Sequence, residues 1–225
     1  MEEKFVKKTV TVWLFLLLLC NLTPFAQAGG PPRVVHTAER PAIRVPPQEA
    51  PASLKKIYSN LAASKTDLYN DNLGFQESGP NSIGGTYFIG LPFTPTANST
   101  VEQVQVAVQY GGSGANQVNL SIYGDSGGVP GTLLAGPVMV ANLPEAGTCC
   151  TLAVANFPPV AVIGGTRYWV VADTPLTGTG SDFNGVWDFI AKPPIYLQAY
   201  SNGSGWFGFN SSPAEAAGEV LGSIP

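Results

Sequence analysis

Charge is scarce in this chain. Charged residues make up 12% of the sequence, against roughly 25% in ordinary soluble domains. Most of the basic residues fall before residue 57, so the remainder of the chain is acidic. An acidic body repels the phosphate backbone of nucleic acids, and we therefore expect no nucleic-acid partner.

Histidine is almost absent, because His36 is the only one in the chain. It lies in a proline-rich stretch, outside the segment that has the pattern of a folded domain. Without an imidazole as general base, the sequence disfavours a Ser-His-Asp or Cys-His hydrolase. It also excludes a histidine-rich metal site. We expect the protein not to be an enzyme.

The N-terminus has the three parts of a secretory signal. A cluster of lysines is followed by the apolar run "VTVWLFLLLL" (residues 10–19) and by "AQA" (residues 26–28), which suits a signal peptidase. The run is far shorter than the roughly twenty residues that a membrane-spanning helix needs. The sequence predicts a signal peptide over residues 1–28 and a protein that is secreted, to the extracellular space or the cell surface.

Two composition zones follow the signal. Residues 29–56 contain six prolines, few apolar residues and no periodicity, which predicts an extended, disordered linker. From residue 57 to residue 225, turn signals recur about every eight to twelve residues, as in sandwiches and barrels. We therefore expect one folded domain over residues 57–225.

The pattern within that domain indicates strands. Apolar and polar residues alternate over residues 104–110 and again over residues 117–122, which predicts strands with one buried face. Residues 166–173, "TRYWVVAD", are more continuously apolar and predict a central strand. A long helical period is missing throughout. The predicted fold is all-β, a two-sheet antiparallel β-sandwich of jelly-roll type.

Five segments carry a resemblance to a known family. They occur in the order "IYSNL" (57–61), "FTPTANSTVEQVQVAV" (93–108), "LSIYGDSGGVPGTLLA" (120–135), "TCCTL" (148–152) and "GGTRYWVVA" (164–172). Together they resemble the choice-of-anchor R domain of secreted bacterial proteins, over most of residues 57–223. The resemblance implies a secreted β-sandwich that is surface-displayed in many members and has no established activity. Members often carry a C-terminal sorting segment. This chain stops at Pro225, so we expect no stable membrane anchor.

Two tryptophans suggest a binding role. Trp187 and Trp206 each lie in a short segment beside glycine and asparagine, "NGVWDF" and "GSGWFGFN". An exposed ring can stack on a sugar while neighbours such as Asp188 and Asn184 bond its hydroxyls. Alternatively, both rings cap the core, because aromatic side chains dominate core packing. Two functions stay open: a non-enzymatic surface or matrix module that contacts a surface protein, and a carbohydrate-binding module for an extracellular glycan.

Acidic residues offer two weaker hypotheses. Asp173, Asp182 and Asp188 flank a glycine-rich loop, and a pair of carboxylates is what a glycosidase uses. Asp125 and Asp182 are weak candidates for a structural calcium site. Loop aspartates more often form turns, and "DSGG" at Asp125 suits an Asx-type hydrogen bond. We expect no cofactor.

The adjacent cysteines Cys149 and Cys150 pose a separate question, because Cys20 leaves with the signal peptide. Secreted proteins meet oxidising conditions, in which thiols tend to pair. Successive side chains of a regular strand point to opposite faces, so a bond between neighbours needs an irregular backbone. Pro144 and Gly147 allow one. Three states stay open: a disulfide between the two neighbours, two thiols, and bonds to other chains.

Overall fold

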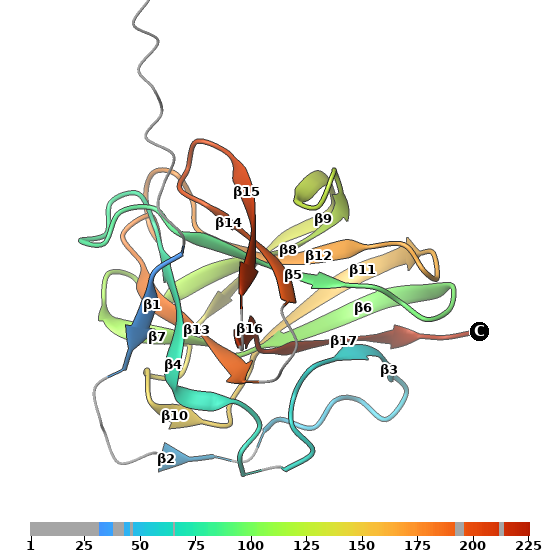
Figure 1. Cartoon of the computed structure of the whole chain (residues 1–225). Helices are drawn as coiled ribbons and strands as arrows, with labels where there is room; N and C mark the ends of the chain where they lie inside the picture. Colours follow the sequence, from blue (N-terminus) through green and yellow to red (C-terminus); the bar gives the residue numbers. More distant parts are fainter. Residues whose placement is uncertain (1–31, 38–42, 46, 65, 192–195, 212–213) are drawn as a thin grey trace, which may run out of the picture.

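The computed structural model describes residues 32–37, 43–45, 47–64, 66–191, 196–211 and 214–225 (Figure 1). Over these residues the chain folds into strands, connected by turns and loops, with no helix. The described part accordingly holds no helix that is long and apolar enough to cross a membrane. The prediction of an all-β fold is confirmed, and the arrangement is consistent with a β-sandwich.

One layer is a six-stranded antiparallel sheet in the order β15-β14-β5-β12-β8-β9. Its strands are β5 (Phe88–Phe93), β8 (Gln117–Asp125), β9 (Pro130–Ala141), β12 (Tyr168–Asp173), β14 (Tyr196–Ser201) and β15 (Trp206–Ser211). The predicted central strand is β12, and Val170 pairs with Leu91 of β5 and Ile122 of β8. This sheet lies above β6 and β17 in Figure 1.

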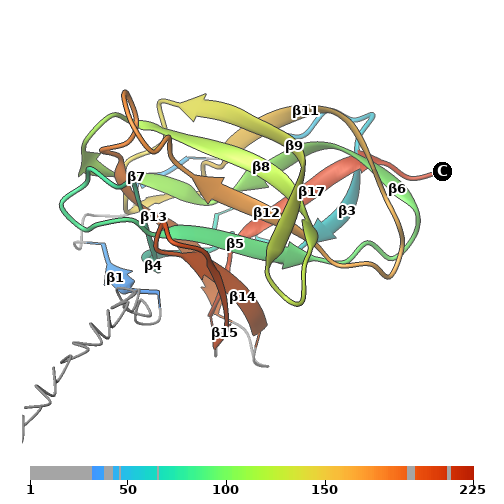
Figure 2. The same ribbon diagram turned by 90° about the horizontal axis from the view of Figure 1, so that it is seen from above.

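The other layer consists of two smaller antiparallel sheets, in the orders β11-β6-β17-β3 and β1-β4-β13-β16, with β7 also on β13. Their strands are β1 (Val34–His36), β3 (Lys55–Ser59), β4 (Asn70–Ser78), β6 (Ser99–Val106), β7 (Val108–Ser113), β11 (Ala153–Val162), β13 (Asn184–Ala191), β16 (Ala214–Ala216) and β17 (Gly218–Ser223). The sheets meet where Asp188 N–H donates to the Ala107 carbonyl at 2.9 Å and the Asp188 carbonyl accepts from Ala217 N at 2.9 Å. Figure 2, seen from above, shows β1 and β4 at one end of β5, and β17, β3 and β6 toward its other end.

The core between the layers is mainly apolar. The alternating residues of β8 point into it, and Val118, Leu120 and Ile122 are all buried, as the sequence predicted. Val104 and Val106 of β6 meet them from the opposite layer. Burying apolar side chains in this way contributes about 25 cal/mol per Å² of surface removed from water.

The strand predicted over residues 104–110 differs from the structure in two ways. It is interrupted at Ala107, between β6 and β7, and its polar face is buried as well. Gln105 donates to the side-chain oxygen of Gln103 at 2.8 Å, and Gln109 accepts from the backbone N–H of Gly147 at 2.8 Å. The amides satisfy one another and the backbone, and this compensates for their burial.

The proline-rich segment is also different from the prediction. Within its described residues, β1 pairs antiparallel with β4, and β2 (Ile43–Arg44) pairs parallel with β10 (Thr148–Cys149). β3 begins at Lys55, before the predicted domain boundary. A disordered linker over residues 29–56 is therefore wrong for these residues, because the sheet edges of the body supply partners for their backbone groups. The predicted signal peptide lies outside the described residues.

Candidate functional site

The candidate site is a cleft of about 510 Å³ beside β1. It lies over Gln76 of β4 and Val186 of β13, which pair with each other. The next pair along, Phe75 and Trp187, points the opposite way into the core, because side chains alternate along a strand. The cleft volume is within the range of small-molecule sites, roughly 300–1,000 Å³.

One wall of this cleft is formed by the segment that was predicted to be a linker. Arg33 and His36 line the cleft, the first just before β1 and the second at its end. The Arg33 carbonyl accepts a hydrogen bond from Gln76 N at 2.8 Å, which fixes the wall on β4. The floor has little room for further side chains, since a Cβ at Gly111 would lie 2.8 Å from the Asn184 carbonyl oxygen.

The cleft lining combines one aromatic ring with several polar groups. Its polar members are Arg33, His36, Thr37, Gln76, Tyr110, Glu145 and Asn184, and apolar side chains such as Val35, Ile83 and Val186 complete it. The Tyr110 ring is held by stacking on Phe183, with centroids 6.3 Å apart and an interplanar angle of 29°. Its hydroxyl donates to the Gly114 carbonyl at 2.8 Å. Such a set offers an apolar face together with donors and acceptors to a polar ligand.

Of the predicted sugar-binding residues, only Asn184 lines this cleft. Trp187 is 0% exposed, and its indole N–H donates to the Ala217 carbonyl at 2.9 Å. Asp188 is buried to the same degree. The expectation of an exposed Trp187 ring is therefore wrong, because alternation along β13 turns this side chain into the core and not toward solvent.

Trp206 lies elsewhere, on β15 of the opposite layer. Its half-buried ring packs against a small cluster around Trp169. A more open hollow on the same sheet is lined by residues that include Asp125, Arg167 and Asn210. The structure thus does not bring Trp206 together with Asn184.

The calcium candidates serve other contacts. Asp125 Oδ1 accepts from the Trp169 indole N–H at 2.8 Å, and Oδ2 accepts from Gly128 N at 3.2 Å, which is the predicted turn-type bond. Asp182 Oδ1 accepts from Ala115 N at 3.1 Å. Within the described ranges, no group of three or more histidine, cysteine or acidic residues could hold a metal ion.

A buried acidic pair lies at the junction of the two smaller sheets. Neither carboxylate oxygen of Asp188 has a hydrogen-bond partner among the described residues, and Asp71 Oδ2 has none either. Burial, reinforced by the nearby Asp71, raises the pKa of Asp188 well above its usual range. Burial likewise raises the pKa of Tyr69, with Asp188 adding to the shift.

A second acidic pair is formed by Glu77 of β4 and Asp173 of β12. Burial and the neighbouring Asp173 raise the pKa of Glu77 well above its usual range, and Glu77 Oε2 accepts from Ile89 N at 3.0 Å. Burial raises the pKa of Asp173 to about 6, while a hydrogen bond from the Asn119 side chain opposes the shift. Asp173 interacts with Glu77, Asp188 interacts with Asp71, and Asp182 makes a loop contact. Asp173, Asp182 and Asp188 therefore lie in separate environments, and no two of them form the carboxylate pair that a glycosidase would use.

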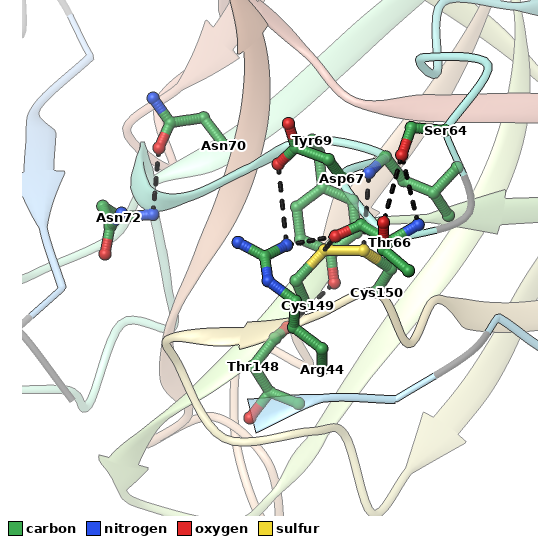
Figure 3. A network of polar contacts seen from close by, with 11 residues as sticks. Arg44, Ser64, Thr66, Asp67, Tyr69, Asn70, Asn72, Thr148, Cys149 and Cys150 are labelled. Atoms are coloured by element: carbon green, nitrogen blue, oxygen red, sulfur yellow. Dashed lines mark hydrogen bonds and ion pairs between the residues drawn. A yellow bond between two sulfur atoms is a disulfide. The ribbon is translucent and has the colours of Figure 1, made fainter. Parts of the chain in front are cut away.

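The adjacent cysteines form a disulfide with each other, across a cis peptide bond (Figure 3). Of the three states left open by the sequence, the structure contains this one. Both side chains are fully buried. Tyr69 holds the surrounding loop, because its hydroxyl lies 3.0 Å from the Thr148 carbonyl and 2.9 Å from the Thr151 carbonyl.

Sequence reasoning missed Arg44, which lies over the cysteine pair. Its guanidinium hydrogen-bonds the Thr66 carbonyl and forms an ion pair with Asp67 at 3.6 Å (Figure 3). The Thr66 carbonyl oxygen is also 3.9 Å from Cys149 Sγ. No local signal could have placed Arg44 there, because the contact arises from the parallel pairing of β2 with β10.

Comparison with known proteins adds no assignment: no family model, curated protein or solved structure matches the chain. The resemblance to the choice-of-anchor R domain stays a prediction that rests on the five sequence segments.

Proposed function

We propose that this protein is an exported, non-enzymatic binding module that takes a glycan in the cleft beside β1 and acts at the cell surface or in the extracellular matrix. The observation that carries the proposal is the cleft of about 510 Å³ lined by Tyr110, Asn184 and Arg33. Export rests on the predicted signal peptide, because nothing in the fold bears on localisation.

The lining combines apolar and polar groups, which suits an amphipathic ligand such as a sugar. The Tyr110 ring supplies a face for stacking, and its own position is fixed by Phe183. Amide and charged groups from three strands or their flanks surround it, among them Asn184, Gln76 and Arg33. A sugar ring has an apolar face and a rim of hydroxyls, which matches a lining where the Tyr110 ring and apolar side chains such as Val35 and Val186 lie among polar groups.

An array of defined oligosaccharides tests the proposal. The wild-type protein should bind a subset of the array, and Asn184→Ala should weaken that binding about tenfold, since the bound sugar loses a hydrogen-bond partner. Arg33→Gln should weaken binding of the same oligosaccharides.

Trp206→Ala is the matched control, because Trp206 lies outside the cleft lining and should leave binding unchanged. Loss of binding in Trp206→Ala with full binding in Asn184→Ala would move the site to the other layer. Binding of a surface protein at the same cleft, without any bound oligosaccharide, would favour the protein-contact module instead.

A further inference from the structure

The cysteine pair is the most chemically specific feature that the proposed function leaves unused. Both cysteines are buried, and the backbone of Val45, directly after β2, is bonded to theirs. Val45 N–H donates to the Cys149 carbonyl at 2.6 Å, and Cys150 N–H donates to the Val45 carbonyl at 2.9 Å. We call β2 together with Val45 the cover, because a reductant reaches a buried disulfide only when a segment bonded around it moves.

The cover is weakly attached. β2 is a two-residue strand, and its parallel partner β10 is equally short. The ion pair of Arg44 with Asp67 adds little, because the side chains are 44% and 72% exposed and solvent screens such pairs. Short segments with few bonds open locally at a much lower free energy than the whole domain.

The two sulfur atoms have different surroundings. Leu68 N–H points at Cys150 Sγ at 3.4 Å, so it can donate to a thiolate there. Cys149 Sγ instead faces the Thr66 carbonyl at 3.9 Å, which can accept from a thiol but cannot stabilise a negative charge. A hydrogen bond to the charged form favours that form, so Cys150 is the better leaving group.

We propose that Cys149–Cys150 is a thiol–disulfide exchange site beside β2, where a dithiol attacks Cys149 and Cys150 leaves as the thiolate.

The electrons balance with a dithiol as the reductant. One thiolate of the dithiol attacks Cys149 Sγ, a new S–S bond forms, and the electron pair of the Cys149–Cys150 bond goes to Cys150. The second thiolate of the dithiol then attacks its own sulfur in the mixed disulfide. Cys149 is released as a thiolate and takes a proton from water. The dithiol becomes a cyclic disulfide, and the cysteine pair gains two electrons.

The cover is tested by the rate of reduction. The mature protein is incubated with dithiothreitol under native conditions, quenched with N-ethylmaleimide at intervals, and its mass is measured. Val45→Pro removes the N–H that bonds Cys149, and the loss of one such bond should speed reduction about fivefold. Gln48→Pro, at an exposed position just beyond β2, is the matched control and should reduce at the wild-type rate.

The asymmetry is tested by single substitutions. Cys150, left alone in Cys149→Ser, should react with iodoacetamide at neutral pH several-fold faster than Cys149, left alone in Cys150→Ser. If Val45→Pro does not fold, Arg44→Ala gives the same test of the cover with a smaller acceleration. Equal reduction rates in wild type and cover variants, or faster alkylation of Cys149, would overturn the proposal. Uptake of two labels by the native protein without reductant would overturn it as well.

Discussion

The side chains around β12 and around β13 are both buried, but they differ in polarity. Val170, Val171 and Ala172 of β12 are all fully buried, and every one is apolar. On β13, Trp187 is followed by Asp188, a carboxylate that is 0% exposed and has no hydrogen-bond partner among the described residues. The apolar region around Val170, Val171 and Ala172 stabilises the fold at any pH. The acidic region, made of the buried carboxyls Glu77, Asp173 and Asp188, couples its stability to protonation.

The largest effect is expected in the apolar region. Leu120→Ala removes a fully buried side chain from between the layers and leaves a cavity. It should lower the free energy of unfolding by about 2–5 kcal/mol, by a similar amount at pH 5 and pH 8. Urea unfolding at both values checks this, and a strongly pH-dependent loss would mean that the two regions are not separable.

The acidic region should respond in the opposite direction. Asp188→Asn replaces a fully buried ionisable carboxyl by a neutral amide of the same shape. At pH 8 it should raise the free energy of unfolding on the order of 1–3 kcal/mol, because an unpaired buried polar group is costly and more so when charged. Asp182→Asn, on an exposed loop side chain, is the control and should change little. Destabilisation by Asp188→Asn at pH 8 would show that the carboxylate has a partner in solution, such as a cation.

The pH dependence of the wild type should come from the acidic region, which includes Asp173 at the end of β12. Asp173 has a folded-state pKa of about 6, raised from its usual 3.8. A group with a raised folded pKa contributes stability that is complete below the unfolded value and is lost as pH rises toward the folded value. Stability should therefore fall between about pH 4 and pH 6, and Glu77 and Asp188 should extend the fall to higher pH. Asp173→Asn should flatten the curve over the first interval, as followed by thermal unfolding; an unchanged curve would assign the fall to other groups.

The smallest effect is expected at the surface. Arg44→Ala removes an ion pair whose partners are 44% and 72% exposed, and such pairs contribute about 0–1 kcal/mol. Global stability should stay within that margin in chemical unfolding. A larger loss would mean that β2 is an integral part of the core and not a cover.

The sequence predicted the strands of the apolar region, whereas it did not predict the burial of the acidic region. The alternation in β8 and the continuous apolar run in β12 are local patterns, and the structure confirms both. The burial of Gln109 and Asp188 depends on strands that are distant in sequence, because only the pairing of β13 with β4 and β7 encloses them. Polar residues in a strand predict exposure until such partners are known.

The candidate site shows the same limit. Asn184 was predicted and lines the cleft, whereas Trp187 was predicted beside it and faces the core. The side-chain alternation of a strand separates neighbours onto opposite faces, and the sequence alone did not show which face of β13 meets the other layer. Arg33 and His36 were assigned to a linker, because prolines around them hide the short pairing of β1 with β4.

The proposed function is tested most directly by NMR titration of the mature protein with the best-binding oligosaccharide of the array. The account predicts that backbone amide shifts change at Tyr110–Gly112 and at Asn184–Val186, which line the cleft, with little change at Trp206. Shifts that centre on Trp206 and Asn210, or no change with any oligosaccharide of the array, would contradict it.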